Sequence, residues 1–579
     1  MNKRSDEAMS EMDEELLALL LDEEGGDVES KAGIERRSLP GAPAPLSYGQ
    51  RQLWLMHQLE PGLTAYNLTR AFRLSGALDV LALERALQAL VARHDVLRTR
   101  FDVIDDEPVQ VVLDQSPLAL QLEDLDNGGD TSAMLDQRLR EAAGTVFDLT
   151  TAPLLFARLF RTAPDQHVLV IGMHHLVSDG WSNAVLMRDL AAGYRQALGG
   201  AAVTLPAVPL AYADYAVWQR GRMQAPALLA DLDYWDDYLR GVPPLALPGD
   251  RARPTEGHAG ARLRFTLPAV LAQQLQAFCR QQGCTSFVAC FAAWQVLLAR
   301  YSGQNDFAVG VPSAGRAREE LHGLVGFFVT TQAYRARLRP EMSWSDLCRQ
   351  VRADSLAAMN HAEVPLELLL ERRRGTLRDD PRQPLFQSMF GLQIIDGADA
   401  PTLHGLQVEL IDLEDGSSKL DLSLEMFVVR GEVQCAIEYS TGMFDAATID
   451  RVRDDYQRLL ELMVDNPERV LGETDFLSTA QHRQLAAWGR NEHRYPSMAP
   501  VQRRFEARAA ARPDAVALLC GDESLSYQEL NLRANRLAHR LTELGVGPES
   551  LVGIALERSV AMVVGLLAIL KAGGAYVPF

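Results

Sequence analysis

One apolar strand constrains the fold of this chain more than any other feature. Residues 167–173 read His-Val-Leu-Val-Ile-Gly-Met, a nearly continuous apolar run. Such a run is typical of a strand that is covered on both faces. Helical spacing of apolar residues returns at 181–197. A strand that is buried on both sides and leads into a helix predicts an α/β fold with layered sheets and helices.

The chain alternates strand-like and helix-like stretches in two sections of similar size, 46–218 and 219–477. In the second section, apolar spacing predicts helices at 268–279 and 285–301 and a strand at 306–311. Two sections of the same class predict two α/β lobes.

The flanking segments differ in composition from the two sections. Residues 1–45 form an acidic tail with clustered leucines, where a short helix is expected, followed by a Pro/Gly linker; globular sequence is expected from Leu46. A second linker is expected at 478–500, and a new helix–strand–helix unit at 501–579. The sequence after residue 576 predicts the beginning of a strand with no sheet to join.

Composition excludes several classes of function. The formal net charge is −20, whereas nucleic-acid binding needs a basic face. Six cysteines contain no Cys-x-x-Cys pair, so neither a zinc site nor a disulfide framework is indicated. The N-terminal apolar run is too acidic at its flanks for a signal peptide, and no apolar run reaches the roughly 20 residues that cross a bilayer. We therefore expect a soluble, cytoplasmic protein without nucleic-acid or membrane partners.

The apolar strand leads directly into His174, His175, Asp179 and Gly180. Metal binding is disfavoured because adjacent side chains on an extended segment point to opposite faces. Acyl transfer is the alternative: one histidine faces a cavity and acts on a nucleophile, since imidazole has a pKa near working pH. Asp179 is then an orienting partner or an ionic brace, and Gly180 permits a sharp turn that brings its N–H near an oxyanion. Two ordinary histidines beside a turn remain an alternative explanation.

Six segments, in this order along the chain, resemble the motifs of one family. They are LSYGQRQLWLMHQLEPGLTAYN (46–67), RHDVLRTRF (93–101), MHHLVSDGWS (173–182), YADYAVWQ (212–219), VGFFVTTQ (325–332) and HAEVPLELLLERRRGTLRDDPRQPLFQSMF (361–390). Together they resemble the condensation domains of nonribosomal peptide synthetases. LSYQELN (525–531) and LKAGGAYVPF (570–579) resemble the start of an adenylation domain.

This resemblance implies two chloramphenicol-acetyltransferase-like lobes in a V-shaped pseudo-dimer, followed by a partial adenylation segment. It also implies a tunnel between the lobes with the histidine motif at its middle. An upstream donor carrier protein and a downstream acceptor carrier protein approach from opposite mouths, each with its substrate on a phosphopantetheine arm. No bound cofactor and no metal is expected in the domain itself.

The resemblance assigns roles to the motif residues. His175 is the catalytic histidine, His174 faces structure, and Gly180 lies at the reaction centre, while Trp181 and Ser182 complete the motif.

Asp179 matches a position that braces the loop through an arginine. Arg93 is the best candidate for that partner, with Arg98 and Arg316 as open alternatives.

The chain also departs from the family pattern at a few positions. Gly49 stands where alanine is commoner, Thr330 replaces asparagine, and 372–374 form an unusual basic run.

The implied reaction is amide formation: a downstream aminoacyl thioester attacks an upstream acyl or peptidyl thioester. His175 either removes a proton from the amine or holds the amine by a hydrogen bond. A starter domain that takes a fatty acyl group from coenzyme A or from an acyl carrier is an alternative, as is a non-catalytic carrier-recruitment domain. The acidic tail favours elongation, because it suits docking on an upstream synthetase. An epimerase is disfavoured by the adenylation-like sequence that follows, and a heterocyclising relative by the intact histidines.

Overall fold

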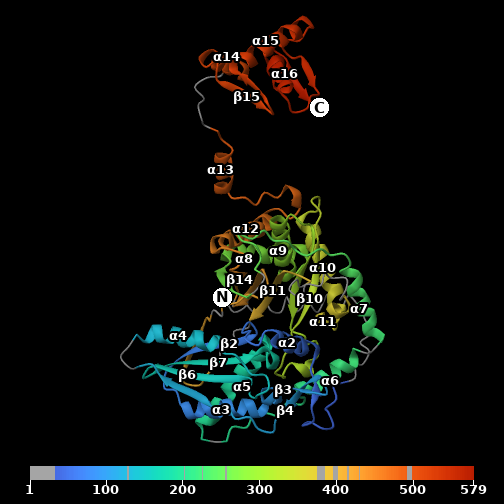
Figure 1. Ribbon diagram of the computed structural model, residues 1–579. Coiled ribbons are helices and arrows are strands. Elements are labelled where there is room, and N and C mark those ends of the chain that lie inside the picture. Colours follow the sequence, from blue (N-terminus) through green and yellow to red (C-terminus); the bar gives the residue numbers. More distant parts are fainter. Residues whose placement is uncertain are drawn as a thin grey trace. The chain divides into compact units, whose positions relative to one another are not determined.

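The computed structural model describes residues 33–126, 130–200, 202–223, 226–254, 257–373, 385–395, 402–413, 416–429, 431–491 and 499–579 (Figure 1). The chain divides into two compact units, Met1–Leu477 and Ser478–Phe579. The helix expected in the acidic tail and the last residue of the basic run, Arg374, lie outside the described residues.

The first lobe of the larger unit is built on a five-stranded sheet with the order β12-β2-β7-β6-β5. Its strands are β12 (Gln407–Ile411), β2 (Asn67–Ser75), β7 (Gln166–His174), β6 (Leu155–Ala163) and β5 (Leu120–Asp124). Strand β7 is the apolar strand of the sequence, and residues 167–174 are all buried. The prediction of a strand that is covered on both faces is therefore confirmed.

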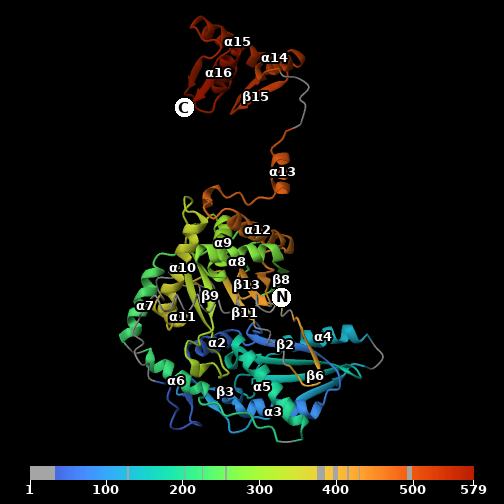
Figure 2. The ribbon, with the colours of Figure 1, turned by 180° about the vertical axis from the view of Figure 1, so that it is seen from behind.

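Alternate side chains of β7 enter two different apolar clusters. Val168 and Val170 pack on the side of helix α4 (Thr131–Ala143). Leu169, Ile171 and Met173 pack in the cluster that contains helices α3 (Val80–Arg93) and α5 (Gly180–Leu198). Helix α4 covers one face of the sheet and α3 and α5 the other (Figures 1 and 2). The period-2 alternation of a strand thus places helices on both faces.

The second lobe is built on a six-stranded sheet with the order β10-β9-β11-β13-β14-β8. Its strands are β8 (Gly260–Thr266), β9 (Asp306–Ser313), β10 (Thr330–Arg337), β11 (Ser388–Ile395), β13 (Leu422–Val429) and β14 (Glu432–Ser440). Helices α8 (Ala269–Gln282), α9 (Ser286–Ser302), α10 (Trp344–Asn360) and α12 (Ala446–Asp465) pack in this lobe. Residues 288–299 of α9 are all buried, as expected of a helix that is apolar all round. The predicted two-lobed α/β fold is confirmed.

Two segments of the second section belong to the first lobe. Strand β12 pairs antiparallel with β2, with Gln407 opposite Ser75. A crossing loop, which we define as residues 314–329, buries Leu321, Leu324 and Phe328 in the core of the first lobe. The two sequence sections therefore do not coincide with the two spatial lobes.

Packed structure begins before Leu46. Ile34 is buried in the core of the first lobe. Strand β1 (Ala44–Pro45) pairs with β4 (Glu107–Val112), which also pairs with β3 (Thr99–Ile104) in a small third sheet. The described part of the expected linker is thus held by the lobe.

The described residues of the smaller unit form two two-stranded sheets and four helices. These elements are α13 (Thr479–Trp488), α14 (Val501–Ala511), β15 (Val516–Cys520), β16 (Glu523–Ser526), α15 (Tyr527–Glu543), β17 (Leu551–Ile554), α16 (Val560–Lys571) and β18 (Ala575–Pro578). Strand β18 pairs in parallel with β17, with Val577 opposite Gly553. The prediction of a terminal strand with no sheet to join was wrong, because the four-residue partner strand is too short to stand out in the sequence.

Among the described residues, no single helix has both the length and the hydropathy needed to cross a membrane. Helices α8 and α9 meet these criteria only together, across a bend of 105°.

Candidate active site

The histidine motif lies where β7 ends and α5 begins. His174 is the last residue of β7, and His175 opens a short 3₁₀ turn, His175–Val177. The backbone N–H of His175 donates to the carbonyl of Tyr66 at 2.9 Å. Asp179 caps α5 by accepting the N–H of Ser182 at 2.7 Å. The motif is therefore fixed at both ends, by the sheet and by the helix cap.

The imidazole of His175 has a defined tautomer. Its Nδ1 lies 2.8 Å from the carbonyl oxygen of Ser178. A carbonyl only accepts, so Nδ1 carries the proton and Nε2 keeps a free lone pair. Burial, and secondarily the positive charge of Lys419, lower the pKa of His175 to about 3. His175 is therefore neutral at physiological pH, with Nε2 as its acceptor atom.

The imidazole of His174 has the opposite role. Its Nδ1 accepts the backbone N–H of Leu176 at 3.1 Å, and the side chain is buried. The rings of His57 and Phe147 each approach it edge-on, with centroids 6.0 Å away. Burial, and then repulsion from the protonated forms of His57 and His175, lower its pKa to about 3. His174 thus points into packed structure and supports the turn.

The described residues contain no group of three or more His, Cys, Asp or Glu that could hold a metal ion.

The carboxylate of Asp179 is fully buried and accepts hydrogen bonds from two directions. One oxygen accepts the N–H of Ser182, from its own helix. The other accepts the N–H of Phe328, from the crossing loop, at 3.0 Å. The guanidinium of Arg316 donates to both oxygens, at 3.2 and 3.3 Å. Asp179 therefore joins the histidine turn to the crossing loop.

Arg316 is nearly as buried as its partner. Its Nη1 donates to the carbonyls of Leu321 at 2.6 Å and Leu324 at 2.8 Å. Its Nη2 also donates to the hydroxyl of Ser182 at 2.8 Å, and the guanidinium stacks 4.0 Å from the ring centre of Phe328. Arg316 thereby joins two carbonyls of the crossing loop to each other and joins the loop to α5.

The expectation that Arg93 braces Asp179 was wrong. Arg93 lies in the last turn of α3 and pairs with Asp189 at 3.2 Å. Asp189 follows Asp179 by ten residues, which is roughly 15 Å along a helix axis. Arg98, the second candidate, bonds Asp95 and the carbonyl of Val91. The partner is the third candidate, Arg316, which is 137 residues away in the sequence.

Gly180 is the first residue of α5 and is exposed. Its φ is not in the left-handed region, so the turn itself does not require glycine. A Cβ at this position would meet no atom within 4 Å, so open space lies beside the first residue of the helix.

Trp181 and Ser182 contact the crossing loop. The indole N–H of Trp181 donates to the carbonyl of His322 at 3.0 Å, although the side chain is 43% exposed. The hydroxyl of Ser182 lies 3.0 Å from both the N–H and the carbonyl oxygen of Gly326. It accepts from the first and donates to the second, so Ser182 fixes the loop in register with α5.

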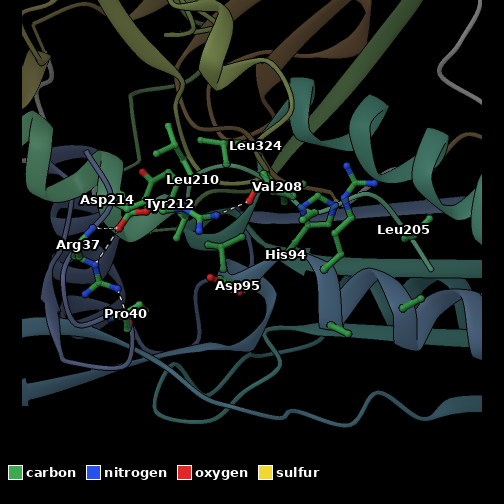
Figure 3. A pocket seen from close by; sticks show the side chains of 18 of the residues that line it. Arg37, Pro40, His94, Asp95, Leu205, Val208, Leu210, Tyr212, Asp214 and Leu324 are labelled. Atoms are coloured by element: carbon green, nitrogen blue, oxygen red, sulfur yellow. Dashed lines mark hydrogen bonds and ion pairs between the residues drawn. The ribbon is translucent and has the colours of Figure 1, made fainter. Parts of the chain in front are cut away.

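A cavity of about 460 Å³ lies elsewhere in the first lobe (Figure 3). Its lining includes Arg36, Arg37 and Pro40, the end of α3 and residues of the segment 203–214. Arg37 pairs with Asp214 at its wall, at 3.3 Å. Its lining includes neither His175 nor Gly180, so this cavity is distinct from the histidine site.

Two parts of the chain match known protein families. Residues 42–486, more than three quarters of the chain, match the condensation domain family. The chain belongs to that family. Residues 505–579 match the AMP-binding enzyme family. The chain is thus a nonribosomal peptide synthetase condensation domain, an amide-forming acyl or peptidyl transferase, followed by the first part of an adenylation domain.

Individual relatives are synthetases of much greater length. The chain is 38% identical to a linear gramicidin synthase of Brevibacillus parabrevis over 543 residues, which are 93% of this chain and 11% of the relative. It is 38% identical to chondramide synthase cmdD of Chondromyces crocatus over 94% of this chain and 14% of that protein. The chain therefore spans roughly a tenth of the length of these curated relatives.

A solved structure shares the fold. A four-domain nonribosomal peptide synthetase bound to AMP and glycine superimposes with a TM-score of 0.75 and 24% identity. The match covers 96% of this chain and 42% of that one.

Proposed function

We propose that His175 acts directly on the amine of an acceptor aminoacyl thioester, and that its Nε2 accepts a hydrogen bond from that amine. The observation that supports this role is the fixed tautomer, in which Nδ1 is bound to Ser178 and the lone pair of Nε2 is free. The amine nitrogen attacks the carbonyl carbon of the donor thioester. The C–N bond forms and the C–S bond breaks, and the proton that the amine loses is taken up by the departing thiolate, which leaves as the donor thiol.

The low pKa of His175 favours positioning over full proton abstraction. A general base is most effective when its pKa lies near the working pH. Burial holds the pKa of His175 at about 3, so its conjugate acid is strong and the imidazole is a weak base. A neutral acceptor can still orient the lone pair of the amine toward the thioester, and alignment of two bound substrates supplies much of the acceleration.

The residues after His175 hold the reaction space open and in register. The open space before Gly180 accommodates the reacting carbonyl. The first N–H groups of a helix have no partner within the helix, so Gly180 can donate to the developing oxyanion. Asp179 and Arg316 keep this helix start against the crossing loop.

The proposed partners are two carrier proteins that present their substrates on phosphopantetheine arms. The adenylation sequence that follows suits an elongation module, which receives a chain from an upstream donor and passes it to a downstream acceptor. Within the tail over residues 1–45, the acidic part that precedes the packed segment is proposed to dock on the upstream synthetase. A fatty acyl donor is the competing possibility, as in a starter domain.

His175→Ala and His175→Gln test the role of the histidine. Alanine removes the acceptor and should lower the condensation rate between two loaded carriers by about 10²-fold or more. Glutamine can place an amide oxygen near the position of Nε2, so it should recover part of the rate if the role is hydrogen bonding. The measurement is the intact mass of the loaded carriers over time.

His404→Ala is the matched control, because His404 is an exposed histidine of the same unit. It should condense at the parent rate. Near-parent rates with His175→Ala would contradict the assignment, and a glutamine variant as slow as the alanine variant would favour proton abstraction.

A further inference from the structure

Phe327 is the crossing-loop residue that reaches the histidine. Its ring meets the imidazole of His175 edge-on, with centroids 4.9 Å apart and an interplanar angle of 72°. The side chain is half-buried. A residue of the second sequence section thus forms the wall beside the proposed reaction centre.

Hydrogen bonds fix the backbone on both sides of Phe327. Gly326 bonds the hydroxyl of Ser182 through both its N–H and its carbonyl oxygen. The carbonyl of Phe327 itself accepts the phenol of Tyr212, and the N–H of Phe328 donates to Asp179. The main chain cannot shift without breaking these bonds. Any adjustment at this point must therefore come from the phenyl ring.

The phenyl ring of Phe327 occupies the space that a side chain at position 49 would need. Gly49 is the second residue of α2 (Tyr48–Leu59). A Cβ at Gly49 would lie 2.7 Å from Cε1 and 3.1 Å from Cδ1 of Phe327, closer than carbon atoms approach. Glycine weakens a helix, and the φ of Gly49 is not in the left-handed region, so the backbone does not require it. The neighbouring ring is what explains a glycine here.

We propose that Phe327 is a positioning residue for His175, and that Gly49 provides the room that allows the ring to lie edge-on against the imidazole. The hydrogen bond to Ser178 fixes one atom of the imidazole, and the phenyl ring restricts its rotation about that bond. The two contacts together fix the direction of the Nε2 lone pair. This inference rests on the proposed role of His175 and adds the pair of residues that aligns it.

Gly49→Ala tests the pair without removing any existing contact. The new methyl group pushes the phenyl ring out of place, and a misplaced imidazole should lower kcat about tenfold or more. The melting temperature should not fall by a comparable extent, because alanine favours the helix. Gly62→Ala is the control, since a Cβ there meets no atom within 4 Å, and it should leave kcat unchanged.

The second variant removes the ring while keeping an apolar side chain. Phe327→Leu should lower kcat by about the same factor as Gly49→Ala, with little change in KM. Adding Gly49→Ala to Phe327→Leu should not lower kcat further, because the ring atom with which the methyl group clashes is gone.

Three results would overturn the inference. The first is parent kcat in Gly49→Ala, and the second is a double variant that loses about a hundredfold as independent effects would. The third is a fall in kcat that only follows a fall in melting temperature, which would show that Phe327 merely fills the core. These outcomes are separate from those of His175→Ala, which tests whether the histidine acts at all.

Discussion

Helix α5 and its cap carry two buried aspartates that differ in what they connect. Asp189 pairs with Arg93 at 3.2 Å and with His94 at 2.9 Å, both at the end of the neighbouring helix α3. Asp179 pairs with Arg316, from the crossing loop of the second sequence section. The first pair joins two adjacent helices of one layer. The second joins two parts of the chain that meet only in the folded molecule.

The difference shows where a salt bridge can influence chemistry. The Asp189 pair holds α3 and α5 together, and those helices also share a large apolar contact. The Asp179 pair holds the crossing loop, and that loop places Phe327 against His175. The two buried carboxylates therefore differ in what they hold: Asp189 joins two neighbouring helices, and Asp179 joins α5 to the loop that contacts His175.

The largest expected effect is that of Asp179→Ala. The substitution leaves the Arg316 guanidinium buried without its counter-charge, which typically costs about 3–5 kcal/mol of the free energy of unfolding. It also releases the N–H of Phe328, so kcat per folded molecule should fall by about 10²-fold. Thermal melting and carrier-to-carrier condensation measure the two effects.

Asp189→Ala is the matched comparison on the same helix. The side chain of Arg93 is 13% exposed and reaches water more readily than that of Arg316. The free energy of unfolding should therefore fall by less, about 1–3 kcal/mol, and kcat should be nearly unchanged. Equal losses of kcat in the two variants would show that the contrast between the two aspartates is false.

The sequence predicts the features that depend on neighbouring residues. Local periodicity predicted β7, α9 and the two-lobed α/β class, because their apolar residues repeat at the spacing of strand or helix. The resemblance predicted a catalytic role for His175 and an arginine partner for Asp179. It selected Arg93, which lies in a conspicuous motif, although that arginine pairs with the other aspartate.

The remaining features depend on contacts between distant segments. Strand β12 lies in the second section and pairs with β2 of the first, which no local pattern reveals. Arg316 and Phe327 reach the site for the same reason: the loop crosses to the other lobe. The reason for Gly49 is likewise invisible until the ring of Phe327 is placed beside it.

An intermediate effect is expected from acidification. Burial, which outweighs the hydrogen bond to Asp189, lowers the pKa of His94 below 6.5. The unfolded chain then binds more protons than the folded one, so the free energy of unfolding falls as the pH drops below about 6.5. His94→Gln removes the contribution of this imidazole and should make the fall in the free energy of unfolding shallower between about pH 6.5 and 5. Denaturant unfolding at several pH values measures it.

His94→Gln also tests whether the ion pairs of Asp189 act independently of the Asp179–Arg316 pair. The pH dependence of kcat should be unchanged in His94→Gln, because the imidazole of His94 is hydrogen-bonded to Asp189 rather than to Asp179. A shifted pH profile of kcat would mean that the Asp189 cluster also communicates with the site.

The smallest effect is expected at the outer partner of Asp189. Arg188 lies 3.4 Å from that carboxylate, but its side chain is 63% exposed. An exposed ion pair contributes about 0–1 kcal/mol, since water and salt screen the attraction and ordering the side chain costs entropy. Arg188→Ala should therefore change the melting temperature only slightly, less at high salt, and leave kcat at the parent value. A loss as large as that of Asp189→Ala would mean that the exposed arginine, rather than Arg93 and His94, neutralises the buried carboxylate.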